Sequence, residues 1–162
     1  ELSLHYDVKE DRIVFPMFLE GKMVDAIGRA VDSKVIPKWK RYGSEADGFV
    51  RGDCAIAVIV EDCTSAAVVE TLGLTGVAIL GTTINQNHIQ GLKGYKKVIV
   101  ALDPDAAPKT IEHTRKLKAN GIDAFALKLL DDIKYRRAED IAYLQKLKRE
   151  FNGTTDIKEP TK

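Results

Sequence analysis

Four short apolar runs alternate with helix-like stretches after Asp53, and this alternation constrains the fold more than any other feature. The runs have the length of strands, and they stay apolar without a polar alternation, which is typical of strands buried on both faces of a sheet. Strands that alternate with helices form βαβ units, so the sequence predicts an α/β fold with a mainly parallel sheet flanked by helices. The runs are residues 55–60, 76–80, 97–102 and 122–129, and the expected helices are 64–72, 85–92, 106–120 and 138–151.

The N-terminal stretch has a different pattern. Residues 12–19 and 23–31 flank a short glycine-containing turn and predict a β-hairpin. Residues 35–42 predict a third extended piece, confined to an edge or an irregular segment because Pro37 cannot donate to a strand ladder. Residues 44–53 are the best candidate boundary. We therefore predict a small N-terminal β-rich subdomain (1–52), an α/β domain (53–151) and a flexible tail (152–162).

Acidic residues follow two of the apolar runs. Glu61 comes directly after the first run, and Asp103-Pro104-Asp105 follows the third. The carboxyl ends of parallel strands meet at one edge of the sheet, so these three carboxylates are expected to converge there. Two like charges about 4 Å apart repel by roughly 4 kcal/mol at an effective dielectric near 20, which a divalent cation would relieve. The sequence therefore predicts a Mg²⁺ or Mn²⁺ site, although Asp105 alone could also be explained as a helix N-cap.

The formal net charge of +1 hides separate basic and acidic clusters along the chain. Such patches suit an enzyme that holds cations and polyanions together, and the plainer alternative is a mixed solvated surface. The longest apolar run is far shorter than the roughly 20 residues that cross a bilayer. Cys54 and Cys63, the only cysteines, are too few to form a zinc site.

Three stretches, VIVEDCTSAAVVE, GVAILGTTINQNHIQGL and KKVIVALDPDAAPK, resemble in order and spacing the Toprim domain of primases, topoisomerases and some nucleases. The upstream stretch RIVFPMFLEGKMVDAIGRAVDSKVIPKWKRYG is similar to the segment that precedes Toprim in bacterial-type DNA primases, and topoisomerases and nucleases lack this hairpin. The resemblance covers about residues 12–145. It implies the Toprim catalytic core of a bacterial or phage-type DNA primase.

The resemblance also implies roles for individual residues. Glu61, Asp103 and Asp105 fall on the family's metal-binding, catalytic acids. Arg29 falls on the arginine of a Gly-Gly-Arg element, and Lys38 falls on the lysine of a Pro-Lys-Tyr element. Those basic residues are implicated in holding template or nucleotide phosphates. The expected nucleic-acid- and nucleotide-binding residues are Arg29, Lys38, Lys40 and Arg41.

The sequence departs from the family pattern at several positions. Ser65 stands where an Asp is common, and Ala107-Pro108 replaces an Ala-Gly element. These departures indicate a divergent branch, of the kind seen in phage and mobile-element primases. Two interpretations are open for four further acids. They could have an accessory metal role, or they could be polar loop residues and acids that the helix dipole favours in a first helical turn. These acids are Asp131, Asp132, Glu139 and Asp140.

The resemblance implies an enzyme that joins ribonucleoside triphosphates into short RNA primers on single-stranded DNA, with Mg²⁺ or Mn²⁺ as cofactor. A replicative helicase is the expected partner, either in trans or in a longer chain of which this is a fragment. The expected location is the cytoplasm of a bacterium or phage-infected cell, or alternatively an organelle. Two alternatives remain open: a Toprim nuclease, and a catalytically idle module that binds single-stranded DNA or a helicase.

Overall fold

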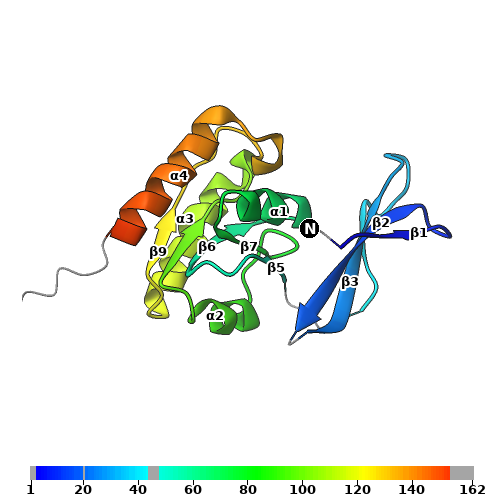
Figure 1. The fold of residues 1–162 in the computed structure, drawn as a ribbon, viewed down its shortest axis with the longest axis horizontal. Coiled ribbons are helices and arrows are strands. Elements are labelled where there is room, and N and C mark those ends of the chain that lie inside the picture. Colours follow the sequence, from blue (N-terminus) through cyan, green and yellow to red (C-terminus); the bar gives the residue numbers. More distant parts are fainter. Residues whose placement is uncertain (1–2, 20, 44–47, 154–162) are drawn as a thin grey trace, which may run out of the picture.

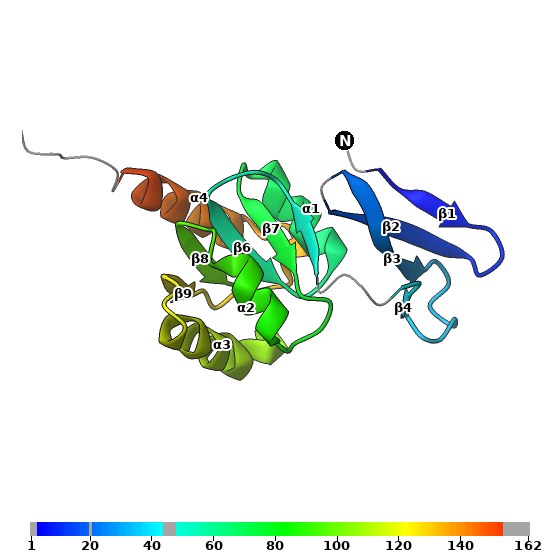
Figure 2. The same cartoon turned by 90° about the horizontal axis from the view of Figure 1, so that it is seen from below.

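The computed structural model describes residues 3–19, 21–43 and 48–153. Within them the chain forms two sheets that lie side by side, a small N-terminal one and a larger one covered by helices (Figures 1 and 2). None of the helices in this part has the length and apolar character of a membrane-spanning segment.

The N-terminal sheet is antiparallel and has the order β1-β2-β3-β4. The predicted hairpin is confirmed, because β2 and β3 pair along their length with an irregularity between Met17 and Phe18. Pro37 precedes β4, and β4 is an edge strand, as predicted. The sequence did not predict β1. The strands are β1 (His5–Asp7), β2 (Arg12–Leu19), β3 (Lys22–Ala30) and β4 (Trp39–Arg41).

The larger sheet has the order β5-β7-β6-β8-β9, and β6 to β9 are parallel, which confirms the predicted α/β class. An antiparallel edge strand, β5, was not predicted and pairs with β7. It belongs to this sheet although it precedes residue 53, and the division of the chain into domains stays a prediction. The strands are β5 (Phe49–Arg51), β6 (Ile56–Val60), β7 (Thr75–Ala78), β8 (Lys97–Val100) and β9 (Ala124–Ala126).

Four α-helices cover the two faces of this sheet. Helices α1 and α4 pack on one face, and α2 and α3 pack on the other. Gly121 follows α3 with a φ of 78°, a left-handed conformation that glycine adopts readily and that commonly ends a helix. The predicted tail lies outside the described residues from Thr154 onward. The helices are α1 (Cys63–Thr71), α2 (Gln86–Leu92), α3 (Ala107–Ala119) and α4 (Ala138–Gly153), with short 3₁₀ turns η1 (Pro104–Ala106) and η2 (Ile133–Tyr135).

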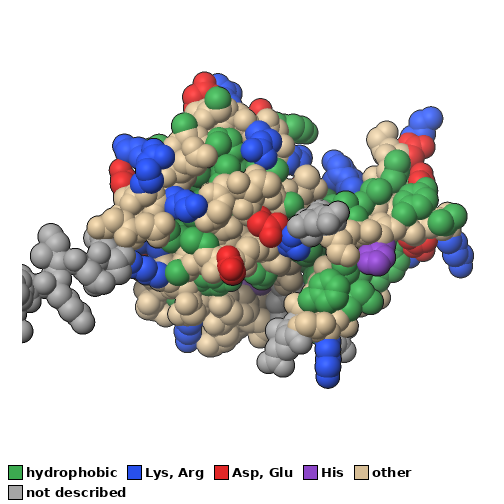
Figure 3. Space-filling view, viewed as in Figure 1, with side chains coloured by type: hydrophobic (Ala, Val, Ile, Leu, Met, Phe, Trp, Pro, Cys, Tyr) green, Lys and Arg blue, Asp and Glu red, His purple; other side chains and the backbone are tan. Residues whose placement is uncertain are grey.

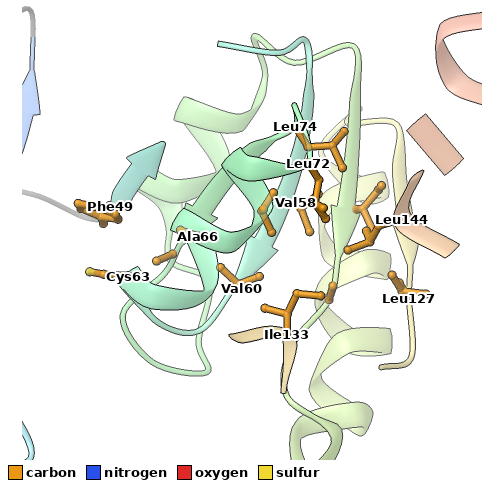
Figure 4. Close-up of a cluster of buried hydrophobic side chains, with 14 of the residues drawn as sticks. Phe49, Val58, Val60, Cys63, Ala66, Leu72, Leu74, Leu127, Ile133 and Leu144 are labelled. Carbon is orange, nitrogen blue, oxygen red and sulfur yellow. The ribbon is translucent and has the colours of Figure 1, made fainter. Parts of the chain in front are cut away.

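Strand β6 forms the centre of the core. All five of its side chains are buried, because helices cover both faces of the sheet, and this explains its continuous apolar sequence. Figure 4 shows side chains of α1, α4 and η2 gathered on one face of the sheet, around Val58 and Val60. The backbone of α1 comes so close to β7 that a Cβ atom on Gly76 would lie 2.3 Å from the Ala66 carbonyl oxygen. A side chain there would therefore force the helix off the sheet.

The N-terminal sheet packs on the same core. Phe15 of β2 makes an edge-to-face contact with Phe49 of β5, at 6.1 Å between ring centroids. Phe15, Met17 and Ile27 belong to the cluster that also contains the buried residues of α1 and β6. This apolar contact fixes the N-terminal sheet against the end of the larger sheet where the parallel strands finish.

Candidate active site

Two neighbouring parallel strands deliver the candidate acids. Glu61 follows β6, and Asp103 follows β8 and the buried pair Ala101-Leu102. The backbone N–H of Asp103 donates to Oε1 of Glu61 at 3.3 Å. One carboxylate oxygen from each of Glu61, Asp103 and Asp105 lies within 4.8 Å of the others. The predicted convergence of these three side chains is therefore present in the structure.

The helix-cap explanation for Asp105 is wrong. Residue Ala106 occupies the N-cap position of α3, and within the described chain no side chain caps that helix. Asp105 lies inside the preceding turn η1, and Asp103 stands at its N-cap without capping it through its side chain. Neither carboxylate is thus used to satisfy a helix terminus.

Burial and the repulsion between neighbouring carboxylates make the charged forms of these acids unfavourable. Burial, with the nearby charges of Asp132 and Glu61, raises the pKa of Asp103 to about 7, and Lys134 partly offsets this. Burial also raises the pKa of Glu61, with further contributions from Asp105 and Asp132. A divalent cation would relieve this repulsion, and half-buried carboxylate oxygens are the donors that Mg²⁺ and Mn²⁺ prefer. The donor set therefore fits a hard divalent ion.

A lysine, Lys134, lies inside the acidic cluster, and no pattern along the chain predicted it there. Nζ of Lys134, in η2, lies 3.2 Å from Oδ2 of Asp62 and also contacts Oδ2 of Asp132. Burial lowers the pKa of Lys134, but the hydrogen bond and charge of Asp132 and the charge of Asp62 outweigh it and raise the pKa above its ordinary value. Lys134 is therefore a fixed positive charge beside Asp103.

A cleft of about 280 Å³ connects the acids with the N-terminal sheet. Arg29 of β3, Lys38 and Trp39 of β4 line it from one side, and Glu61 and Asp103 line it from the other. On the face drawn in Figure 3, acidic side chains lie close to the junction of the two parts of the molecule. The cleft thus places the basic side chains of Arg29 and Lys38 opposite the candidate metal ligands Glu61 and Asp103.

Arg29 is held in place by aromatic packing. Its guanidinium carbon lies 5.0 Å from the centre of the Trp39 ring, a cation–π contact. Trp39 in turn packs on Phe15, at 5.8 Å between ring centroids. This stack holds Arg29 at the wall of the cleft, and Trp39 is itself partly buried.

The structure does not bring Lys40 and Arg41 to this cleft. Lys40 forms an ion pair with Glu10 and lies over the Tyr42 ring, at 5.6 Å from its centre. Arg41 pairs with the buried Asp25, at 3.4 Å. Among the described residues neither lines the cleft. Their role in binding nucleic acid stays a prediction, and the geometry gives it no support.

Of the four further acids, three have local roles and one lies at the cluster. Oδ1 of Asp131 accepts the backbone N–H of Asp132 at 2.8 Å. Asp140, at the start of α4, is buried and accepts hydrogen bonds from the backbone N–H groups of Leu130 and Asp131, so it organises the loop before α4. Glu139 is exposed and pairs with Arg137. Asp132 alone lies at the cluster, where its contact with Lys134 places it.

Two other polar side chains are buried. His113 of α3 is one of them, and its Nε2 lies 2.7 Å from the carbonyl oxygen of Thr82. Ser65 is fully buried beneath the cluster, where its backbone N–H donates to Oδ1 of Asp62 at 2.8 Å.

Comparisons with known proteins agree with this architecture. No family model matches the sequence, and no curated protein matches it. Solved structures that match include the Aquifex aeolicus primase with its zinc-binding and RNA polymerase domains: 21% identity and a TM-score of 0.69, over 88% of this chain and 40% of that one. The RNA polymerase domain of Mycobacterium tuberculosis primase DnaG matches at 20% identity and a TM-score of 0.61, over 84% of this chain and 54% of that one.

The chain therefore has a primase-type fold. It spans about half or less of the length of these two structures. At such low identity the likeness shows the fold alone, and the chemistry has to be argued from the side chains of this chain.

Proposed function

We propose that this chain is the catalytic core of a DNA primase, which joins ribonucleoside triphosphates into short RNA primers on single-stranded DNA. The observation that carries the proposal is the meeting of Glu61 and Asp103 with Arg29 and Lys38 in one cleft of a primase-type fold, with a carboxylate oxygen of Asp105 within 4.8 Å of those two acids. Acids that hold a cation and bases that hold phosphate are the two requirements of nucleotidyl transfer.

The acids would hold Mg²⁺ or Mn²⁺, which would supply charge stabilisation at the reacting phosphate and help to activate the attacking 3′-hydroxyl. Arg29 presents a planar fork of donors that suits two phosphate oxygens, and Lys38 adds a point charge beside it. Because Arg29 is stacked on Trp39, it is oriented before the substrate arrives. The chain's own residues thus bind and align the triphosphate against the acidic edge of the sheet.

The finer assignments belong to the same proposal. The larger sheet with its helices would be a Toprim domain, and the N-terminal sheet would be the accompanying primase subdomain. A single-stranded DNA template and ribonucleoside triphosphates would be the ligands, with a replicative helicase as partner. Residues Lys40 and Arg41 would then contact template outside the cleft.

Incorporation of labelled ribonucleotides on single-stranded DNA tests the proposal, with Mn²⁺ or Mg²⁺ present and a replicative helicase added. Asp103→Asn should abolish incorporation, because it removes one ligand charge while keeping the side-chain shape. Asp123→Asn is the matched control: Asp123 is exposed, pairs with Lys97 and precedes β9, at the opposite end of the sheet.

Isothermal titration of Mn²⁺ into the same three proteins separates binding from catalysis. The wild type and Asp123→Asn should bind the ion, and Asp103→Asn should not. Metal-dependent cleavage of the DNA, lost in Asp103→Asn, would favour the nuclease alternative instead. Absence of Mn²⁺ binding by the wild type would overturn the catalytic proposal and favour an idle binding module.

A further inference from the structure

The position of Lys134 bears on how many cations the cleft can hold. Two carboxylates, those of Asp62 and Asp132, contact its ammonium group. Lys134 also lines the same cleft as Glu61 and Asp103. In two-metal sites for phosphoryl transfer the two ions lie about 3.5–4 Å apart. A second ion in this cleft would therefore have to share its acids with a cation that belongs to the chain.

Hydrogen bonds to other groups position the two acids that contact Lys134. The Oδ1 atom of Asp62 accepts the Ser65 backbone N–H and caps α1, so only its Oδ2 faces Lys134. The Asp132 side chain is flanked by the Ser65 hydroxyl, at 3.5 Å from its Oδ1. Next to Lys134, the buried side chain of Ile133 fixes η2 in the core. Asp62 thus lies at the N-terminus of α1, and Asp132 and Lys134 belong to η2 and the residue before it.

We propose, on the basis of the proposed function, that the Lys134 ammonium group occupies the place of a second cation. The site then binds a single divalent ion, held by Glu61, Asp103 and Asp105. Asp62 and Asp132 serve as the counter-charges of Lys134 and are not metal ligands in the wild-type chain. Like-charge repulsion keeps a second divalent ion away from an ammonium group at such short range.

The number of bound Mn²⁺ ions, measured by isothermal titration, tests this inference. The wild type should bind one ion. Lys134→Met, which keeps the apolar stem and removes the charge, should bind two. Lys134→Arg should bind one, because the positive charge is retained. The matched control is Lys128→Met, which removes an exposed lysine that does not line the cleft and should also bind one ion.

A double variant locates the added ion. Lys134→Met combined with Asp132→Asn should return to one ion, because the second site has lost an acid. Electron paramagnetic resonance gives an independent reading: two Mn²⁺ ions about 4 Å apart couple magnetically, and a single ion does not. The coupled spectrum should be seen in Lys134→Met alone.

Folding is checked by the thermal midpoint of each variant with and without Mn²⁺. If Lys134→Met does not fold without metal, Lys134→Gln replaces it, and the wild-type stoichiometry still decides the question. Two ions in the wild type, or one ion in Lys134→Met, would overturn the inference and leave the proposed function standing. No ion in the wild type would overturn both.

Discussion

Replacing Asp103 with Asn should stabilise the metal-free protein at pH 8 while removing its cation binding. The carboxylate of Asp103 is half-buried beside Glu61 and Asp132, and these surroundings raise its pKa from 3.8 to about 7. Above pH 7 the folded chain must keep this group charged in a place that favours the neutral form. Asn has nearly the same shape and carries no charge, so it removes that cost.

The magnitude follows from the pKa difference. At 1.36 kcal/mol per pH unit, the difference corresponds to an upper limit of roughly 4 kcal/mol. Solvent reaches part of the Asp103 side chain and screens the charges, which lowers the expected gain to about 1–2 kcal/mol. For a chain of this size that gain raises the thermal midpoint by about 3–6 °C.

The sign of the pH dependence is fixed by the same pKa values. Because the folded chain holds the Asp103 proton up to about pH 7 and the unfolded chain loses it near pH 4, the destabilisation is absent below pH 4. It grows as the pH rises and is complete above pH 7. At pH 5 the gain from Asp103→Asn should therefore shrink to about two fifths of its value at pH 8.

Thermal denaturation followed by circular dichroism, with a chelator present at pH 8 and pH 5, measures these differences. Added Mn²⁺ should then raise the midpoint of the wild type and leave that of Asp103→Asn unchanged. Asp123→Asn, an exposed acid at the other end of the sheet, should behave as the wild type throughout. A variant no more stable than the wild type at pH 8, or one that gains equally at both pH values, would refute the reasoning.

Three further predictions concern other parts of the molecule. Gly76→Ala should lower the free energy of unfolding by about 2–4 kcal/mol in urea titrations, because its Cβ would meet the backbone of α1. The control Gly91→Ala, which has open space around the added Cβ, should not be destabilising. Equal effects of the two substitutions would contradict this packing. Asp140→Asn should cost about 2 kcal/mol by weakening its hydrogen bonds to the loop before α4, with Mn²⁺ binding retained; loss of the ion instead would assign Asp140 to the metal site. Arg29→Ala should weaken binding of a ribonucleoside triphosphate about tenfold, read from the fluorescence of Trp39, the only tryptophan; unchanged affinity would remove Arg29 from the site.

The parallel sheet and its acidic edge could be predicted because their signals are local. A run such as residues 55–60 is apolar throughout only where helices cover both faces, and Glu61 and Asp103 stand at fixed positions relative to such runs. Strands β1 and β5 were missed because three residues are too few to show a period.

The contacts that cross the fold could not be read in this way. Lys134 meets Asp62 across 72 residues of sequence, and no spacing along the chain encodes that meeting. Lys40 and Arg41 follow two residues that line the cleft, but the register of β4 on β3 and the nearby acids Glu10 and Asp25 direct their side chains elsewhere.

The sequence by itself determined the α/β class, the hairpin and the three converging carboxylates. The hydrophobic period and the ends of the strands depend on neighbouring residues, so they can be recognised from the sequence alone. Only the tertiary structure decided which charges share the cleft, because that depends on how the N-terminal sheet packs through Phe15 and on where the loop after β9 places Lys134. The electrostatics of a site are set by distances through space, and those distances exist only once the chain has folded.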